Sequence, residues 1–503
     1  MIKRSSGVLL NISSLPGEFG VGGFSADCVE FATRIADMGF SWWQVLPLTT
    51  IGDGDSPYSG VSAFALNYLY VDPYRLCEKG LIEERSLDRF RYYEPYQVDY
   101  PFVRAAKKEL LRTAYAAIGD DIRAEMAEYY KQNIDWLRDY AVYMTLADRN
   151  EGKSWRYWPD EWRIYDKKRV SAFAKQNAAD VDYYVFEQYI LDAQWARVRR
   201  EVAGVGVGII GDIPMYVGYD SVDVWANKEQ FLLDGDLKPV IIAGVPADDY
   251  SAEGQLWGNP VYNVARMKRD GYRWWIRRLE RCFAMYDCLR IDHFRGLYQF
   301  YACEADAKNA LNGKWYDGLG RAFINKVKSH FGDGVNIIAE DLGQIDDDVR
   351  AFLADSGFPG MRVLQFGFSE SDSLHQPHNY TENCVAYTAT HDNNTTLAWL
   401  YSLSDWSRNR VLNYCGYYGH DWGKGGRDSM SVKACMRSIL SSVATLAIVP
   451  VQDMCGFGAD TRMNTPGVPE GNWRFRLTYN ALYDADRDFF REINDLYCRT
   501  PKR

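Results

Sequence analysis

The sequence lacks the cysteine and histidine patterns that hold a zinc ion or a disulfide framework. Its ten Cys include no CxxC pair, and none of its six His lies at metal-ligand spacing with them. Scattered cysteines of this kind are typical of reduced, mostly buried thiols in an intracellular protein. We therefore expect neither disulfides nor a Cys/His metal centre.

The sequence also lacks excess positive charge and long apolar runs. A net charge of -10 argues against nucleic acid as a partner, because phosphate binding leaves a basic footprint. No apolar stretch is long enough to span a bilayer, and Asn11 and Ser13 interrupt the N-terminal one before it could serve as a signal-peptide core. We expect a folded cytoplasmic protein that binds neither nucleic acid nor membrane.

What the sequence does contain is an alternation of short apolar runs with helical stretches. Many of the runs are apolar on successive residues, as expected for parallel strands buried on both faces. Eight such units predict an α/β fold, a (β/α)8 barrel, which needs about 250 residues. The predicted strands are 7–12, 41–48, 207–217, 286–292, 335–343, 361–368, 384–392 and 444–454.

The surplus of residues predicts large insertions in the loops that follow strands. One insertion is expected at 54–180, between the second and third strands, and its second half has helical apolar spacing. Another, at 221–260, follows the third strand and is expected to lie over the active-site cleft. The chain after the eighth strand leaves space for loops and a last helix, without a C-terminal β-sandwich. We expect residues 1–503 to form a single catalytic barrel unit.

Charged residues gather at the end of the fourth predicted strand, in "CLRIDHFRG" (288–296). Alternate strand residues face the same side, so Arg290 and Asp292 are expected to project together. A guanidinium beside a carboxylate favours the ionised form, which suits a nucleophile, although a structural ion pair at the barrel mouth has the same pattern.

Three other predicted strands also end in carboxylates, at the face where barrel enzymes carry their active sites. These residues are Asp212 in the third strand, Glu340 and Asp341 near the end of the fifth, and His391 and Asp392 at the end of the seventh. Neighbouring strand residues point in opposite directions, so one of Glu340 and Asp341 should enter the site while the other supports a loop or caps a helix.

Several carboxylates with a histidine and an arginine favour glycosyl transfer. A retaining enzyme needs one carboxylate to attack the anomeric carbon and a second, with a raised pKa, to protonate the leaving oxygen. The 75 aromatic residues could supply flat surfaces for sugars or simply fill the core. Two alternatives are a divalent-metal barrel enzyme, in which Arg290 would sit among the ligands, and a non-catalytic glucan-binding protein.

Motifs along the whole chain resemble those of one enzyme family. The segments "LRIDHFRG", "IIAEDLG" and "TATHDNNTTLAW" resemble conserved regions of the 4-α-glucanotransferases called amylomaltases or disproportionating enzymes, glycoside hydrolase family 77 of the α-amylase clan. The segments "SPYSGVSAFALN", "GQLWGNPVY" and "RMNTPGVPEGNWRFR" are similar to further family segments.

The resemblance implies a role for each matching residue. Asp292 would be the nucleophile that forms a covalent glucosyl intermediate, Glu340 the general acid and base, and Asp392 the transition-state stabiliser. Arg290 would hold Asp292 ionised, and His391 would bind donor-site hydroxyls. The remaining substrate-binding residues would be Asp212 as a supporting carboxylate, Tyr58 stacked on the donor sugar, Gln255 and Trp257 over the cleft, and Asn464 at its border.

Three positions depart from the family pattern. Asn394 stands where the family often has Asp, Phe475 stands where it has Trp, and "SGV" follows Tyr58 in place of the commoner "QSF". The first two leave the proposed proton chemistry unchanged. The third bears on which glucan chains the site prefers near Tyr58.

The resemblance also implies the substrates. The enzyme would act on maltodextrins and on α-1,4-glucans derived from starch or glycogen, without a metal or organic cofactor, as a monomer or weak homo-oligomer. Transfer and hydrolysis share the same intermediate, and loops that exclude water and bind an acceptor would favour transfer.

Overall fold

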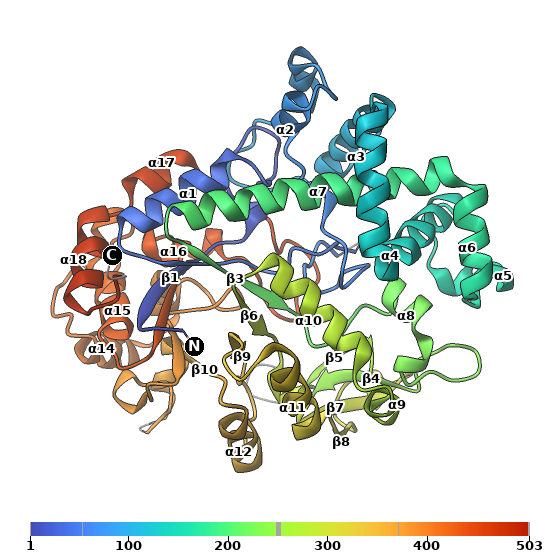
Figure 1. Ribbon diagram of the computed structural model, residues 1–503. Coiled ribbons are helices and arrows are strands. Elements are labelled where there is room, and N and C mark those ends of the chain that lie inside the picture. The colour runs from blue at the N-terminus through green and yellow to red at the C-terminus, as the bar shows by residue number, and fades with distance from the viewer. Residues whose placement is uncertain (1, 53, 248–252, 371, 501–503) are drawn as a thin grey trace.

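The computed structural model describes residues 2–52, 54–247, 253–370 and 372–500, and its centre is a closed barrel of eight parallel strands (Figure 1). Around the barrel the order is β1-β12-β11-β10-β9-β6-β3-β2. The predicted (β/α)8 fold is confirmed. Its strands are β1 (Ser5–Leu9), β2 (Trp42–Gln44), β3 (Gly208–Ile213), β6 (Cys288–Ile291), β9 (Ile337–Ala339), β10 (Gly360–Val363), β11 (Cys384–Tyr387) and β12 (Leu446–Pro450).

The observed strands are shorter than the predicted apolar runs, because two runs change conformation before they end. The run after β10 continues as a 3-10 helix, η7 (Leu364–Phe368), and the run after β12 becomes a helix, α16 (Val451–Met454). Both stretches are apolar because they are partly or fully buried, and apolarity alone does not separate a buried strand from a buried helical turn.

Helices cover the outside of the barrel. α1 lies between β1 and β2, α10 precedes β6, and α11 and α12 flank β9 in the chain. None of the helices in the described ranges is long and apolar enough to cross a membrane. The covering helices are α1 (Ala26–Asp37), α10 (Arg273–Met285), α11 (Gly320–Phe331), α12 (Asp347–Ser356), α13 (Thr396–Ser402), α14 (Asp405–Tyr414), α15 (Met430–Leu440), α17 (Tyr479–Asp484) and α18 (Arg487–Leu496).

The chain between β2 and β3 builds a helical layer at one side of the barrel (Figure 1). Its two longest helices, α4 and α7, pack against each other, and α7 runs on to the start of β3. The helices are α2 (Pro73–Glu78), α3 (Tyr100–Ala116), α4 (Asp120–Arg149), α5 (Asp160–Arg163), α6 (Lys167–Gln176) and α7 (Ala178–Gly204).

A second, antiparallel sheet was not expected from the sequence. Its order is β5-β4-β7-β8, with β4 (Ile241–Val245) and β5 (Gln255–Pro260) in the 221–260 segment and β7 (Gln299–Glu304) and β8 (Lys314–Asp317) after β6. Residues 248–252 of that segment lie outside the described residues. The helices α8 (Val222–Ala226) and α9 (Val264–Arg269) flank β4 and β5 in the chain.

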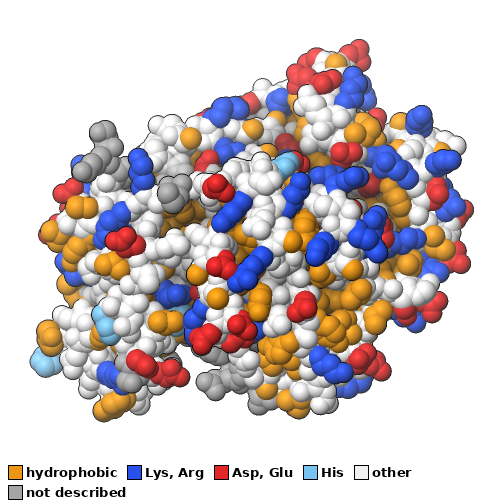
Figure 2. Space-filling view, turned by 60° about the horizontal axis from the view of Figure 1, so that its bottom comes forward, with side chains coloured by type: hydrophobic (Ala, Val, Ile, Leu, Met, Phe, Trp, Pro, Cys, Tyr) orange, Lys and Arg blue, Asp and Glu red, His pale blue; other side chains and the backbone are white. Residues whose placement is uncertain are grey.

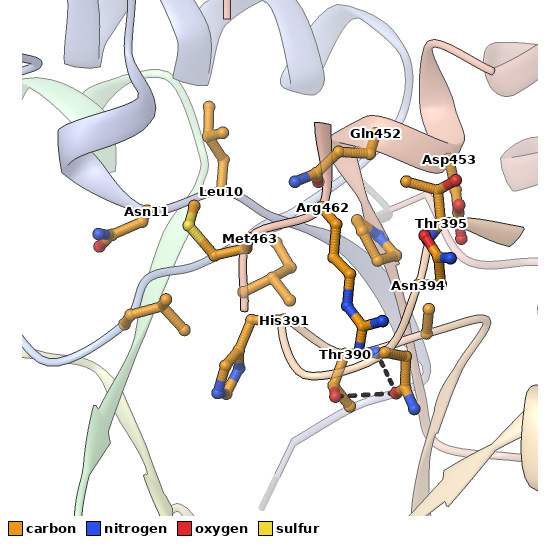
Figure 3. Close-up of a pocket in the computed structure, with 15 residues that line it drawn as sticks. Leu10, Asn11, Thr390, His391, Asn394, Thr395, Gln452, Asp453, Arg462 and Met463 are labelled. Carbon is orange, nitrogen blue, oxygen red and sulfur yellow. Dashed lines mark hydrogen bonds between the residues drawn. The ribbon is translucent and has the colours of Figure 1, made fainter. Parts of the chain in front are cut away.

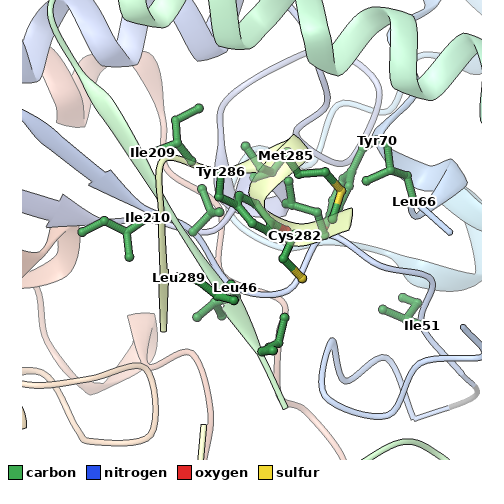
Figure 4. Close-up of a cluster of buried hydrophobic side chains, with 14 of the residues drawn as sticks. Leu46, Ile51, Leu66, Tyr70, Ile209, Ile210, Cys282, Met285, Tyr286 and Leu289 are labelled. Atoms are coloured by element: carbon green, nitrogen blue, oxygen red, sulfur yellow. The ribbon is translucent and has the colours of Figure 1, made fainter. Parts of the chain in front are cut away.

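Close packing holds β3 in place near its carboxyl end, which lies at the barrel mouth. Figure 4 shows Ile209 and Ile210 of β3 within an apolar cluster that includes Tyr286 and Leu289. A Cβ at Gly211 would lie 2.2 Å from the Tyr286 ring, so only glycine allows this ring to lie against the strand. The next residue along β3 is Asp212.

The surface is mixed in character. Figure 2 shows side chains of both charges distributed over one face of the molecule among hydrophobic ones.

Candidate active site

The ends of β3 and β6 carry a chain of three charged side chains. Strand register places Asp212 directly beside Arg290. Arg290 donates from Nη1 to both carboxylate oxygens of Asp212, at 2.8 and 2.7 Å, and from Nη2 to Oδ1 of Asp292 at 2.8 Å. The Arg290 and Asp212 side chains are buried, whereas that of Asp292 is 29% exposed. Of these three charged side chains, Asp292 is therefore the one that a substrate can reach.

The charge on Arg290 is secured by its partners. Burial opposes the charge, but Asp212 and Asp292 outweigh burial and raise the pKa of Arg290 well above its usual range. Burial raises the pKa of Asp212, and the Arg290 guanidinium acts against that rise. Three donor contacts from Arg290 and Tyr58 fit an ionised Asp212, so the site contains a buried ion pair whose cation also bonds to Asp292.

Glu340 follows β9 and has a different environment from Asp292. Its Oε2 accepts the backbone N–H of His293 at 2.6 Å, next in the chain to Asp292, and its Oε1 accepts the N–H of Leu342 at 2.7 Å. Burial, and then the nearby charge of Asp292, raise the pKa of Glu340 from 4.5 to about 8. At neutral pH Glu340 therefore holds a proton that it can donate.

The neighbour of Glu340 faces a different set of groups. Asp341 accepts the backbone N–H of Met361 at 2.5 Å and a hydrogen bond from Arg362 at 3.0 Å. These contacts join the end of β9 to β10, as expected for the supporting member of an adjacent pair.

Tyr58 and His391 form a stacked pair beside the charged chain. Their ring centroids are 5.1 Å apart with an interplanar angle of 15°, and the Tyr58 hydroxyl donates to Asp212 at 2.7 Å. Trp473 lies against both rings: its ring centroid is 5.8 Å from that of Tyr58 and 5.9 Å from that of His391. Three segments distant in sequence thus build one aromatic wall at the mouth of the barrel.

Asp392 is held by three side chains at the edge of the site. Asn464 donates to its Oδ1 at 2.6 Å, Nε2 of His391 lies 3.3 Å from its Oδ2, and Arg462 donates to its backbone carbonyl at 2.7 Å. The Asp392 side chain is 41% exposed. Its carboxylate therefore has a fixed direction and remains open to solvent.

His391 lines a pocket at the ends of β1, β11 and β12 (Figure 3). Asn11, Asn394, Arg462 and Asp453 contribute polar groups to its lining. Asn394, one of the departures from the family pattern, accepts the backbone N–H of Thr395 on its Oδ1 at 3.0 Å, and its backbone carbonyl accepts from Gln365 at 2.9 Å.

Gln255 and Trp257 lie on β5 of the second sheet. Trp257 donates from its indole to Gln255 at 3.2 Å, and its ring meets His293 edge-on at 4.9 Å. His293 has left-handed backbone geometry, with φ at 51°, and burial lowers its pKa to about 4. The buried ring nitrogen Nε2 of His293 and the buried hydroxyl of Tyr216 have no hydrogen-bond partner within the described structure.

All ten candidate residues fall into two connected groups. The first joins Tyr58, Asp212, Arg290 and Asp292 with His391, Asp392 and Asn464 through the contacts above, and Glu340 adjoins it through the amide of His293. The second, Gln255 and Trp257, meets the first through the His293 ring.

Three residues of the site were not singled out from the sequence. These are Trp473, His293 and Arg462, and each reaches the site through a contact that joins separate segments. Trp473 and His293 also have positive φ, at 66° and 51°. The available signals were the motif "GNWRFR" for Trp473 and the position of His293 beside Asp292. Among the described residues, no group of three or more His, Cys, Asp or Glu side chains is arranged to hold a metal ion.

The chain is similar to known proteins along nearly its whole length. The family model described as 4-alpha-glucanotransferase matches residues 10–481. A 4-alpha-glucanotransferase of Aquifex aeolicus is 40% identical over 500 residues, which is 99% of each chain. A chloroplastic/amyloplastic one of Solanum tuberosum is 35% identical and covers 99% of this chain and 87% of its own.

A solved structure has nearly the same fold. The amylomaltase from Streptococcus agalactiae in complex with acarbose has a TM-score of 0.94 and 34% identity to this chain, and the match covers 99% of this chain and 100% of that one.

Proposed function

The chain belongs to the 4-alpha-glucanotransferase family, and on that premise we propose a role for each residue at the barrel mouth. Its activity is the retaining transfer of a segment of an α-1,4-glucan to the 4-hydroxyl of another glucan or of glucose. The proposal concerns how Asp292, Glu340 and Asp392 divide the chemistry of that transfer.

In the first step the donor glucan is cleaved. Glu340 gives its proton to the glycosidic oxygen as the bond from that oxygen to the anomeric carbon breaks, and the leaving chain keeps a free 4-hydroxyl. The Asp292 carboxylate attacks the same carbon and forms a covalent glucosyl ester with inverted configuration. Glu340 is left ionised.

In the second step the acceptor takes the segment. The Glu340 carboxylate removes the proton from the acceptor's 4-hydroxyl, whose oxygen attacks the anomeric carbon and displaces Asp292. Two inversions give net retention, and Glu340 is again protonated. Asp392, with His391, is suited to hold sugar hydroxyls and stabilise the positive charge that develops on the ring.

One observation carries this division of roles: the two carboxyl groups have opposite environments. Asp292 bonds to a guanidinium and is reachable from solvent, whereas Glu340 is buried, bonds to backbone amides and has a pKa of about 8. A pair of this kind supplies a nucleophile and an acid at the same pH.

We further propose that Tyr58 stacks on the donor sugar, with Asp212 and Arg290 as its charged support. Gln255 and Trp257, on β5, would bind the glucan from over the cleft, and Asn464 would bind it at the border of the cleft.

Incubation with maltotriose tests the proposal. Transfer gives glucose and a ladder of longer maltodextrins, whereas hydrolysis gives only glucose and maltose. Asp292→Asn and Glu340→Gln should each abolish the ladder, and near-normal turnover of either variant would refute the assigned roles. Chelator treatment should leave turnover unchanged, because the proposed chemistry needs no metal or organic cofactor.

Further proposals concern setting and organisation. We propose that residues 1–503 work as one catalytic unit, as a monomer or weak homo-oligomer, on maltodextrins and on starch- or glycogen-derived glucans in the cytoplasm. Ten unpaired cysteine thiols support a reducing compartment. Light scattering on the purified chain tests the oligomeric state.

A further inference from the structure

The loop that carries His391 and Asp392 is fastened at both ends by one buried side chain. The loop begins at Thr388, just after β11, and ends at Thr396, the first residue of α13. Asp453, on α16, accepts the Thr388 hydroxyl at 2.6 Å and the Thr396 hydroxyl at 2.6 Å, both on Oδ2. Its Oδ1 accepts the Thr396 backbone N–H at 2.7 Å.

Asp453 has no role in the proposed proton chemistry, yet it is a carboxyl group that is only 1% exposed. Burial raises its pKa, and the two threonine hydroxyls and the amide act against that rise. Among the described residues no Lys or Arg forms an ion pair with it. Burying a carboxyl group is costly, and within the described part of the chain the donors to the Asp453 carboxylate all belong to the two ends of one loop.

Inside the loop the contacts are local or lead to other loops. Asn393 accepts from the backbone N–H and the hydroxyl of Thr390, both at 2.9 Å, as the dashed lines in Figure 3 show. Gln365 donates to the carbonyl of Asn394 at 2.9 Å. None of these three contacts joins the end of β11 to the start of α13, whereas Asp453 touches both.

We propose that Asp453 is a positioning residue, which sets the place of Asp392 and His391 by tying Thr388 and Thr396 to one carboxylate. This inference rests on the proposed role of Asp392 as the group that stabilises the transition state. A misplacement of about 1 Å in a catalytic group can cost about 100-fold in rate.

The central test is Asp453→Asn, assayed with maltotriose. Asparagine keeps one oxygen for the Thr396 N–H but replaces Oδ2 by an NH2 group, so both threonine hydroxyls must turn to accept. We expect kcat to fall about 100-fold while KM changes by less than about threefold, because the lost geometry matters mainly in the transition state.

A milder variant isolates one end of the loop. Thr388→Val keeps the side-chain shape and removes only the hydroxyl that binds Asp453. It should lower kcat in the same direction by about tenfold, again with little change in KM.

The matched control is Glu187→Gln on α7. Glu187 is also a buried carboxyl group, 3% exposed, bonded to Tyr140 at 3.0 Å and to Gln188 at 3.2 Å. Any loss of stability from neutralising a buried carboxyl group is shared with this variant, and urea unfolding measures it in both. Its kcat should stay within twofold of wild type, about the scatter of kinetic comparisons.

A double-mutant cycle separates positioning from general damage to the fold. If Asp453 acts through Asp392, Asp453→Asn should add less than about threefold to the loss already caused by Asp392→Asn, because residues that act as a unit are non-additive. Maltotriosyl fluoride, whose leaving group needs little acid assistance, keeps both rates measurable.

Two results would overturn the inference: wild-type kcat in a folded Asp453→Asn variant, or fully additive losses in the cycle. Near-normal transfer by Asp392→Asn alone would instead refute the proposed role of Asp392, so the two failures are distinguishable.

Discussion

Replacing Glu340 with Gln is expected to abolish transfer and, at the same time, to make the enzyme more stable in alkali. Burial and Asp292 raise the pKa of Glu340 from 4.5 to about 8. Between these pH values the folded protein keeps a proton on Glu340 that the unfolded chain has released. The free energy of unfolding of the wild type therefore falls as the pH rises through this window.

The size of the effect follows from the raised pKa and from the two amides that Glu340 accepts. At about 1.4 kcal/mol per pKa unit, the rise from 4.5 to about 8 corresponds to about 5 kcal/mol of unfolding free energy lost once Glu340 is fully ionised. Gln cannot ionise, but its NH2 group replaces one of the oxygens that accept from His293 and Leu342, at a cost of about 1–3 kcal/mol at every pH. The variant should thus be less stable than wild type at pH 5 and about 2–4 kcal/mol more stable at pH 9.

Urea unfolding at pH 5, 7 and 9, followed by tryptophan fluorescence, measures the difference directly. The control is Glu128→Gln, because Glu128 is exposed and its pKa is lowered, so it is ionised in both states over this range. A constant difference between Glu340→Gln and wild type at all three pH values would refute the reasoning, since Glu340 would then not hold the proton.

Three further substitutions probe the rest of the site. Arg290→Met should lower the unfolding free energy by about 3–5 kcal/mol in urea, because Asp212 keeps its buried charge without its cation, and an unchanged midpoint would contradict the buried ion pair. Tyr58→Phe should keep far more kcat/KM than Tyr58→Ala, because the ring remains while only the hydroxyl bond to Asp212 is lost; equal losses would count against stacking. Trp257→Ala should raise the KM for maltotriose several-fold with little change in kcat, and an unchanged KM would place Trp257 outside the substrate-binding cleft.

The barrel could be predicted because its strands are buried on both faces. The burial of every residue of β6 and β12 leaves continuous apolar runs in the sequence, and these are readable without knowledge of the partner strands. The second sheet offered no such signal. Only one residue of its strand β5 is fully buried, and Gly244 and Gly258 interrupt β4 and β5. In addition, β4 pairs with β7, which follows β6 in the chain.

The candidate site was predictable where residues are neighbours along one strand and not where they meet across strands. Period-two geometry anticipated that Arg290 and Asp292 face the same side, and the structure joins them at 2.8 Å. The register that sets Asp212 against Arg290 depends on how β3 and β6 align, which the sequence of either strand leaves open. Trp473 reaches Tyr58 only through the folding of a remote loop, and the motif "GNWRFR" around it does not show which residue it will contact.

The hydrogen-bond donors of Arg290 point to groups other than Glu340, the carboxyl group whose pKa is raised to about 8 by burial and by Asp292. Arg290 directs Nη1 to Asp212, Nη2 to Asp292 and Nε to the sulfur of Met361 at 3.4 Å. Glu340 takes its two close hydrogen bonds from uncharged backbone amides instead. A guanidinium in direct contact compensates a buried carboxylate more strongly than amides do, so the two amides leave the pKa of Glu340 raised. The proposed division between nucleophile and acid therefore depends on where one arginine points, before any substrate binds.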